Sequence, residues 1–185
     1  MLKILKLLDS WTAAIIFCIL TALLVWAIGT KTTSSYFPDL SAPPLNPANT
    51  FKVGQVEDLS GFQFAADDQK IAFSLKEAMS FALGTVLTQQ GLGGPGYSIN
   101  VNILAYDPGR TSRFFPAFQG DDLSVEALIV DDKGAKLAKI QVKRHVSVSL
   151  SFFTNGKLFS RDNFKEIFDD VATEIAAVIK KQTGR

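Results

Sequence analysis

The residues whose types could carry chemistry are few in this chain of 185 residues. It has one histidine, His145, and one cysteine, Cys18, which lie far apart in the sequence. A zinc site usually takes about four ligands of these kinds, and a single cysteine excludes an intramolecular disulfide. The sequence therefore predicts no metal site, no cofactor and no disulfide.

His145 is the residue best suited to acid–base catalysis near neutral pH. No Ser-His-Asp or Cys-His pattern lies near it, although such partners are often remote in sequence. Alternation of apolar and polar residues places it on the polar face of a predicted strand. We expect a solvated histidine, no catalytic residue and no enzyme. A hydrolase that uses His145 is the least favoured alternative.

The glycine-rich segment GLGGPG, residues 91–96, is similar to phosphate-binding loops. It follows a predicted helix instead of opening one, and it lacks the Lys-Ser/Thr of a P-loop. We interpret it as a helix stop followed by a turn. Adjacent carboxylates such as Asp131-Asp132 usually point apart, so they predict neither an acid–base pair nor a metal site.

The segment YDPGRTSRFFPAFQGDD, residues 106–122, is the strongest candidate for binding. It connects two predicted strands and is longer than such a connection needs to be. The candidate residues for a partner or an anion are Arg110, Arg113, Phe114, Phe115 and Phe118. The two arginines suit an anion or a partner's carboxylate. The alternative is that they pair with nearby Asp residues while the phenylalanines pack beneath them.

Residues 12–29, TAAIIFCILTALLVWAIG, predict a transmembrane signal anchor. They contain no charged residue and would span about 27 Å as a helix, close to the thickness of a bilayer's hydrocarbon core. The alternative is a cleaved signal peptide, but its apolar part is usually shorter. Cys18 lies in the middle of this run, so we expect no lipidation there.

Lys3 and Lys6 precede the predicted span, and only Lys31 follows it closely. The positive-inside rule then places residues 1–11 in the cytoplasm and the remainder outside it. We expect a single-pass inner membrane protein with a periplasmic or otherwise extracytoplasmic domain. The formal net charge of +1 gives no indication of nucleic-acid binding.

The rest of the chain divides into a spacer and a domain. Residues 30–50, TKTTSSYFPDLSAPPLNPANT, are rich in proline and predict an extended, semi-rigid linker. The alternative for part of it is docking along the domain surface, for which Tyr36, Phe37 and Leu45 are apolar enough. Residues 51–185 predict strands near 51–59, 97–106, 122–132 and 135–152, and helices near 70–89 and 161–181. This β-α-β-β-β-α order predicts an α+β two-layer sandwich, with two helices on one face of an antiparallel sheet.

Two positions in the strand patterns carry particular expectations. Ala105 continues the apolar alternation of Ile99, Val101 and Ile103, so we expect it on the buried face. Arg144 interrupts the apolar face of its own strand, and we interpret it as a mark of the sheet's edge. The basic residues between 133 and 145 would meet an acidic lipid, a polyanion or an acidic partner, or form a solvated face balanced by acids of the last helix.

One stretch resembles a known family. The residues that fit its pattern are Gly109, Arg110, Arg113, Phe114, Phe118, Asp131 and Gly134. Over roughly the C-terminal 90 residues the chain resembles a bacterial envelope family catalogued as domain of unknown function forty-four ten. It departs from that family where the family has a Gly-Phe-Gly-x-Gly segment and here the chain reads AFQGD. The resemblance implies an extracytoplasmic α+β domain without a known activity.

These observations favour a membrane-anchored, periplasmic, non-enzymatic accessory or interaction domain of a cell-envelope complex. Its expected partners are the inner membrane, through residues 12–29, and an envelope protein, with no nucleic acid. The alternative is a binding domain for a lipid or another amphipathic small molecule, which the chain's 15 phenylalanines also suit. That alternative requires a cavity between helices and sheet.

Overall fold

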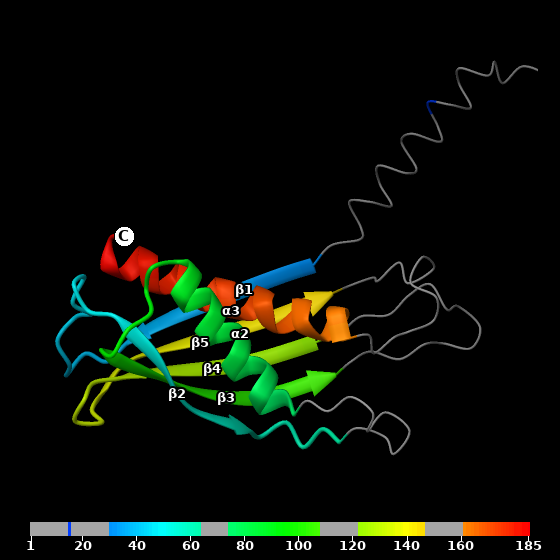
Figure 1. Cartoon of the computed structure of the whole chain (residues 1–185), viewed down its shortest axis with the longest axis horizontal. Helices are drawn as coiled ribbons and strands as arrows, with labels where there is room; N and C mark the ends of the chain where they lie inside the picture. Colours follow the sequence, from blue (N-terminus) through cyan, green and yellow to red (C-terminus); the bar gives the residue numbers. More distant parts are fainter. Residues whose placement is uncertain (1–14, 16–29, 64–73, 108–121, 147–160) are drawn as a thin grey trace, which may run out of the picture.

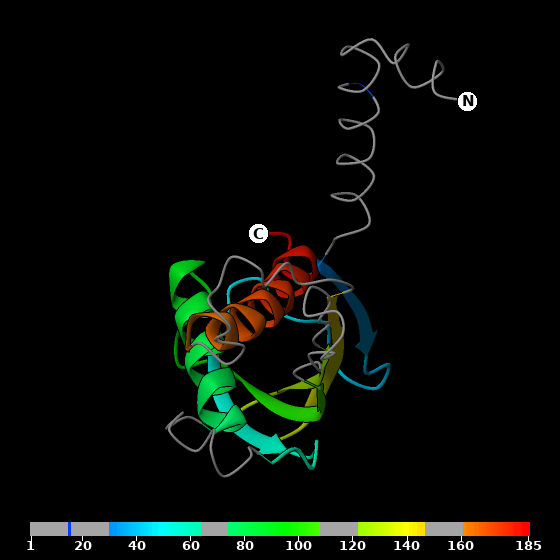
Figure 2. The same cartoon turned by 90° about the vertical axis from the view of Figure 1, so that its right-hand side faces the viewer.

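The computed structural model describes residues 15, 30–63, 74–107, 122–146 and 161–185. Within these ranges the elements follow the order β1 (Thr30–Pro38), β2 (Phe51–Asp58), α2 (Leu75–Gln89), β3 (Tyr97–Asp107), β4 (Asp122–Val130), β5 (Lys136–Val146) and α3 (Arg161–Thr183). The strands form one five-stranded sheet in the order β1-β5-β4-β3-β2 (Figure 1). The sheet curves around the two helices, which pack on one of its faces (Figure 2). The predicted α+β class is confirmed.

The prediction of a purely antiparallel sheet is wrong. β3, β4 and β5 pair antiparallel as expected, but β2 pairs parallel with β3. The helix α2 connects β2 to β3, and a crossover of this kind returns the chain to the same end of the sheet before the next strand begins. The sheet is therefore mixed.

The first part of the predicted linker is also a strand. Residues 30–38 pair along their whole length with β5 and form one edge of the sheet. Thr and Tyr favour strands, and Pro38 stands only at the strand's end, where it does not interrupt the hydrogen bonds. Later in the same segment Leu45 is buried in the core. The prediction of a spacer outside the domain therefore fails for residues 30–38, whereas the expected docking of Tyr36 and Leu45 on the domain is confirmed.

The described side chains of β3, β4 and β5 follow the predicted alternation with one exception. Buried side chains alternate along β3, β4 and β5 as follows: Ile99, Val101, Ile103, Leu123, Val125, Ala127, Ile129, Ala138, Ile140 and Val142. The expectation for Ala105 is wrong, since it is exposed and Tyr106 is buried instead. A register shift between Ile103 and Ala105 explains the change, because one extra residue moves the following side chains to the other face.

α2 begins at Leu75, later than the predicted start near residue 70. Ser74 is its N-cap: the Ser74 hydroxyl accepts from the Glu77 N–H, and the Glu77 carboxylate accepts from the Ser74 N–H. This capping box satisfies two helix-terminal donors and fixes the start. The predicted apolar stripe of α2 is confirmed at Leu75, Met79, Ala82, Leu83, Val86 and Leu87, which are buried.

The GLGGPG segment stops α2 as predicted and also fastens β2. Gly91 adopts a φ of +69°, typical of a residue that ends a helix. The Phe51 N–H donates to Leu92 O at 2.8 Å, and the Tyr97 N–H donates to Thr50 O at 2.9 Å. A Cβ on Gly96 would lie 2.3 Å from the carbonyl oxygen of Thr50. The glycines therefore allow two backbones to approach closely, which is a structural role.

The membrane anchor predicted at residues 12–29 lies outside the described residues except for Ile15, which is helical. In the parts of the chain that the structure describes, no helix is both long and apolar enough to cross a membrane.

Candidate functional site

Residues 106–122, the segment proposed for binding, connect β3 to β4 at one end of the sheet. β3 ends at Asp107 and β4 begins at Asp122, and these two residues are register partners. β1 begins at the same end, where Thr30 pairs with Val146 of β5. Arg110, Arg113, Phe114, Phe115 and Phe118 lie outside the described residues, so their binding role stays a prediction.

Four exposed polar residues form a row across this end of the sheet. Successive register pairs join Asp107 to Asp122, Asp122 to His145, and His145 to Lys31. Neighbouring strands lie about 4.8 Å apart, so the row extends over about 15 Å. It brings together one histidine, one lysine and two carboxylates from four strands.

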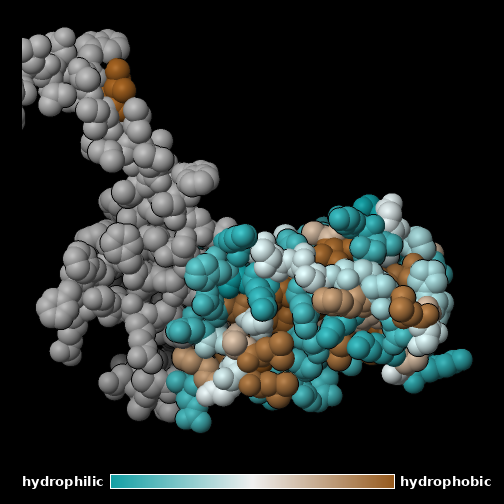
Figure 3. Space-filling model, turned by 180° about the vertical axis from the view of Figure 1, so that it is seen from behind, coloured by the Kyte–Doolittle hydropathy of each residue, from teal (hydrophilic) through white to brown (hydrophobic). Residues whose placement is uncertain are grey.

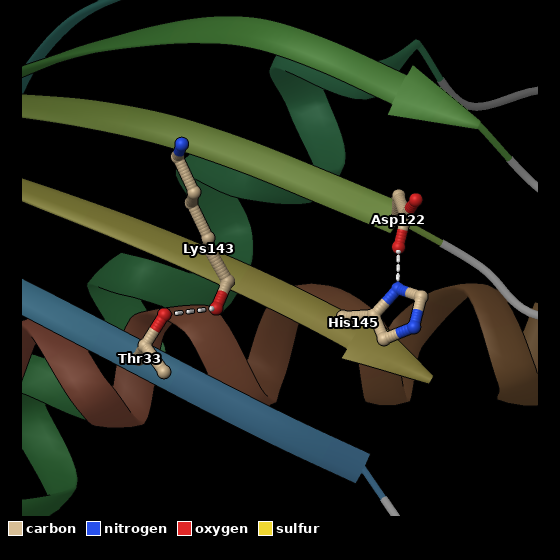
Figure 4. Close-up of polar contacts among 4 residues, drawn as sticks. All are labelled: Thr33, Asp122, Lys143 and His145. Carbon is tan, nitrogen blue, oxygen red and sulfur yellow. Dashed lines mark hydrogen bonds and ion pairs between the residues drawn. The ribbon is translucent and has the colours of Figure 1, made fainter. Parts of the chain in front are cut away.

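Within this row His145 and Asp122 interact directly. The Nδ1 atom of His145 contacts Oδ1 of Asp122, and the other ring nitrogen points away from the carboxylate (Figure 4). A carboxylate at Nδ1 orients an imidazole in catalytic sites too. Here, however, the side chains are 61% and 56% exposed, so water competes for both groups. The predicted polar-face position of His145 is confirmed.

The sequence did not predict the Asp122 partner. The two residues are 23 positions apart, and only the register of β4 and β5 brings them together. The turn at residues 131–134 indicated the hairpin but not the partner, because the pairing shifts by one residue between Ile129 and Val130. Counted from the turn, Asp122 would lie opposite Arg144 instead of His145. In that turn the Asp131 carboxylate accepts from the N–H groups of Lys133 and Ala135, and Gly134 has a φ of +82°.

Behind the row, on the core side, Arg144 forms an ion pair with the last helix. Its side chain is 4% exposed, and its Nε donates to Oδ2 of Asp170 at 2.8 Å. Arg144 does not mark the sheet's edge as expected, because β5 lies between β1 and β4. A guanidinium interrupts the apolar face at low cost only if it is paired, and α3 supplies the carboxylate.

An aromatic group packs on the core side toward the same end of the sheet. The Tyr106 ring lies 4.9 Å from the Phe62 ring in an edge-to-face arrangement, and 6.3 Å from the Phe168 ring. Such pairs contribute about 0.5–1.5 kcal/mol beyond the area that they bury. The core side of this end of the sheet is therefore well packed.

In the parts of the chain that the structure describes, no helix packs on the outer face of the sheet, and the visible side of this face in Figure 3 is mostly hydrophilic with small hydrophobic spots. Lys139 Nζ lies 3.2 Å from Oε2 of Glu126. Partial burial acts to raise the pKa of Glu126, but hydrogen bonds from Gln141 and Lys139 and nearby lysine charges outweigh it, so the pKa lies below its usual value. The basic residues of β5 are therefore balanced in part by the neighbouring strand and in part by α3.

A shallow hollow, wide open to solvent and lined by α2 alone, lies on the exposed side of this helix. It has a volume of about 460 Å³ and is lined by Ser80, Phe81, Gly84, Thr85, Thr88 and Gln89. Phe81 is 63% exposed there, although it is a large apolar side chain. Sequence reasoning missed this feature. The signal was present, because Phe81 lies outside the apolar stripe of its helix.

The position of this hollow bears on the lipid-binding alternative. That hypothesis required a cavity between the helices and the sheet, whereas this hollow opens on the outer side of α2. Side chains from the sheet and both helices, including Phe51, Met79, Ile140 and Phe168, are completely buried in one cluster between the layers. The hollow therefore does not support the lipid-binding hypothesis.

Within the described ranges, no group of three His, Cys, Asp or Glu residues is placed to hold a metal ion.

No family model and no curated protein sequence matches the chain. Several solved structures are similar to it, including the following three. PelC from Paraburkholderia phytofirmans, a dodecamer, is 10% identical with a TM-score of 0.47, over 80% of this chain and 94% of that chain. Protein XCC0632 from Xanthomonas campestris, of family model DUF330, is 11% identical with a TM-score of 0.47, over 80% and 91%. A minor lipoprotein from Acinetobacter baumannii is 13% identical with a TM-score of 0.41, over 77% and 94%.

These structural similarities do not assign a function to the chain. The resemblance of its C-terminal part to domain of unknown function forty-four ten stays a prediction.

Proposed function

We propose that the chain is a non-enzymatic interaction domain, held at the outer side of the inner membrane by residues 12–29, and that it docks a protein of the cell envelope through α2. The observation that carries this proposal is the exposed Phe81 beside the hollow on α2. Aromatic side chains, phenylalanine included, are enriched in protein interfaces relative to the rest of the surface.

The neighbours of Phe81 suit close packing of a partner. Gly84, Thr85 and Thr88 are small or short, so a partner's side chain reaches the helix backbone without displacing a larger group. The Thr88 hydroxyl donates to Gly84 O at 2.8 Å and is thereby already satisfied. An apolar side chain that enters this hollow meets few polar groups in need of water. Burying Phe81 would contribute about 1.5–3 kcal/mol of binding free energy.

The proposal of a non-enzymatic role is supported by the exposure of His145 and Asp122. A general base works best in a site that excludes water and holds a substrate. The pair stands instead on an open strand face, with more than half of each side chain exposed.

The test is recovery of a partner from membranes. The full chain would be purified from detergent-solubilised membranes of its own host, as wild type and as Phe81→Ala. Leu40→Ala serves as the matched control, because Leu40 is 96% exposed and lies after β1, away from the hollow.

We expect a stoichiometric partner with the wild type and with Leu40→Ala, and a loss of about tenfold or more in its recovery with Phe81→Ala. The thermal stabilities of all three proteins should agree. Absence of any stoichiometric partner, or equal recovery with Phe81→Ala, would contradict the proposal.

A further inference from the structure

The two edge strands of the sheet are protected to different degrees against pairing with another strand. β1 forms one edge and β2 the other. An edge strand presents unpaired N–H and C=O groups, and proteins usually protect it with charges, bulges or prolines. β2 has such protection, because its register shifts between Val53 and Val56 and it carries Lys52, Glu57 and Asp58. β2 is therefore poorly suited to accept another strand.

β1 lacks this protection over most of its length. It pairs with β5 from Thr30 to Pro38 without a register shift. Residues 32–37, TTSSYF, contain no charge, glycine or proline, and Thr, Tyr and Phe favour strands. Figure 2 shows β1 at the rim of the curved sheet, and no strand that the structure describes lies beyond it. β1 is therefore an open edge.

The hydrogen bonds to β5 show which backbone groups of β1 point to the open side. The Asp39 N–H donates to Leu137 O at 2.9 Å, and these two residues continue the register of β1 and β5. Hydrogen-bonded pairs alternate with other pairs in an antiparallel ladder, so the odd-numbered residues of β1 bond to β5. The even-numbered residues point their backbone groups outward: Thr30, Thr32, Ser34, Tyr36 and Pro38. Pro38 has no N–H to leave unpaired there.

A second copy of β1 fits this open edge along the whole strand. In an antiparallel arrangement with a two-fold axis at Ser34, Thr32 lies opposite the partner's Tyr36 and Thr30 opposite the partner's Pro38. The outward backbone groups of one copy then face those of the other. A slip by one residue would set outward groups against inward groups, so the hydrogen bonds to β5 restrict the register.

The side chains are complementary in the same register. Lys31 is the only charged residue of β1, and it lies opposite the partner's Phe37, which is 46% exposed. A cation beside an aromatic ring is favourable. Thr33 lies opposite the partner's Ser35, a pair that stabilises neighbouring strands by hydrogen bonding. No two like charges of β1 oppose each other, so a second copy meets no repulsion along this edge.

We infer that β1 pairs antiparallel with β1 of a second copy, so that two sheets join into one continuous sheet. The contact uses the same strand on both copies and closes as a dimer. The inference goes beyond the proposed function and rests neither on the predicted anchor nor on the docking role of Phe81. α2 packs mainly against α3 and β2, and β2 is the opposite edge of the sheet. The hollow beside Phe81 therefore stays open in the dimer.

The first test reads the register by disulfide cross-linking of the full chain in detergent. Cys18→Ser removes the only cysteine, and Thr33→Cys and Ser35→Cys are then made separately, both on the exposed outer face of β1. In the inferred register Thr33 lies about 4.5 Å from the partner's Ser35, which suits a disulfide, whereas identical positions are diagonal neighbours about 7–8 Å apart. The two variants are oxidised separately and as an exchanged mixture.

We expect the mixture to form a covalent dimer at least about fivefold faster than either variant alone, because only the mixture places two cysteines opposite each other. Equal rates in all three samples would indicate random collision, and absence of cross-linking would indicate that the edges do not meet. Either result overturns the inference.

The second test measures the oligomeric state of the full chain by light scattering in detergent. Thr32→Pro removes an outward N–H and leaves the bonds to β5 in place; its circular dichroism shows whether it folds. Phe37→Lys is the second variant, since it sets a lysine opposite Lys31 at both ends of the contact. Adding Lys31→Glu to Phe37→Lys restores opposite charges at the same positions.

We expect a dimer for the wild type and for the double variant, a folded monomer for Thr32→Pro, and a dissociation constant about tenfold or more higher for Phe37→Lys. A monomeric wild type, or a dimer that Phe37→Lys does not weaken, overturns the inference. Loss of the Phe81 partner with an intact dimer would contradict the proposed function alone.

Discussion

Arg144 of β5 and Asp170 of α3 join the sheet to the last helix through a hydrogen-bonded ion pair of 2.8 Å. The arginine is buried and the carboxylate is partly exposed, with 39% of its side chain accessible. The pair stands on the core side of the same strand that carries His145 on its outer side. It ties α3 to the end of the sheet at which β1 begins.

Asp170→Ala is expected to destabilise the domain by about 1.5–3 kcal/mol, because it removes a charged hydrogen-bond partner from a buried guanidinium. Asp169→Ala is the matched control. Asp169 contacts only the exposed Lys165 among the ion pairs that the structure describes, at 3.6 Å, and such pairs contribute less than about 0.5 kcal/mol. Urea unfolding of the full chain in detergent, followed by circular dichroism, measures both. Equal effects of the two substitutions would contradict a specific role of the Arg144 pair.

Gly96→Ala tests the structural role of the GLGGPG segment. The new Cβ would lie 2.3 Å from the backbone oxygen of Thr50, and a backbone atom does not move aside as a flexible side chain does. We expect a loss of at least about 2 kcal/mol in the free energy of unfolding.

Gly84→Ala is the control for this substitution. Its Cβ would meet Val53 at 3.7 Å, an ordinary contact, and alanine favours a helix by up to about 1 kcal/mol over glycine. The same unfolding measurement should show equal or greater stability for Gly84→Ala. A neutral Gly96→Ala would mean that the loop is free to move, which would reopen a binding role for its glycines.

Local sequence patterns predicted the elements better than their connections. Alternation placed Val125, Ala127 and Ile129 on the buried face because each strand reads independently of its neighbours. β1 was missed because four prolines in residues 30–50 suggested a linker, although the first of them, Pro38, stands at the strand's end. The parallel pairing of β2 was missed because strand order follows from the path of α2, not from any one strand.

The two polar pairs of the site could not be predicted from the sequence for a related reason. Arg144 meets Asp170, and His145 meets Asp122, only after register and helix packing are fixed. The exposed Phe81 was different, since its position off the apolar stripe of α2 was visible in the sequence. Two residues that interrupt a local pattern were therefore informative. Arg144 forms a buried ion pair, and Phe81 is an exposed aromatic side chain.

Ser34→Ala tests whether β1 belongs to the folded domain. The Ser34 hydroxyl donates to Oε1 of Glu174 on α3 at 2.5 Å, in a partly buried position. Its loss should cost about 1 kcal/mol. Ser35→Ala, on the exposed outer face of the same strand, should change stability by less than about 0.5 kcal/mol. If neither change affects unfolding, the strand contributes little to stability and acts as a tether after all.

Glu126→Gln should reduce the dependence of stability on acid pH. The folded-state pKa of Glu126 lies below the ordinary value of 4.5, so its carboxylate stabilises the fold above that value. This contribution is expected to disappear as the pH falls from 4.5 through the lower folded-state pKa. Because the side chain is 20% exposed, we expect a contribution of less than about 1 kcal/mol. Urea unfolding at pH 7 and at pH 3 should show that wild type exceeds Glu126→Gln in stability at neutral pH and loses this advantage in acid. An advantage that is the same at both pH values would show that the charge of Glu126 is not its source.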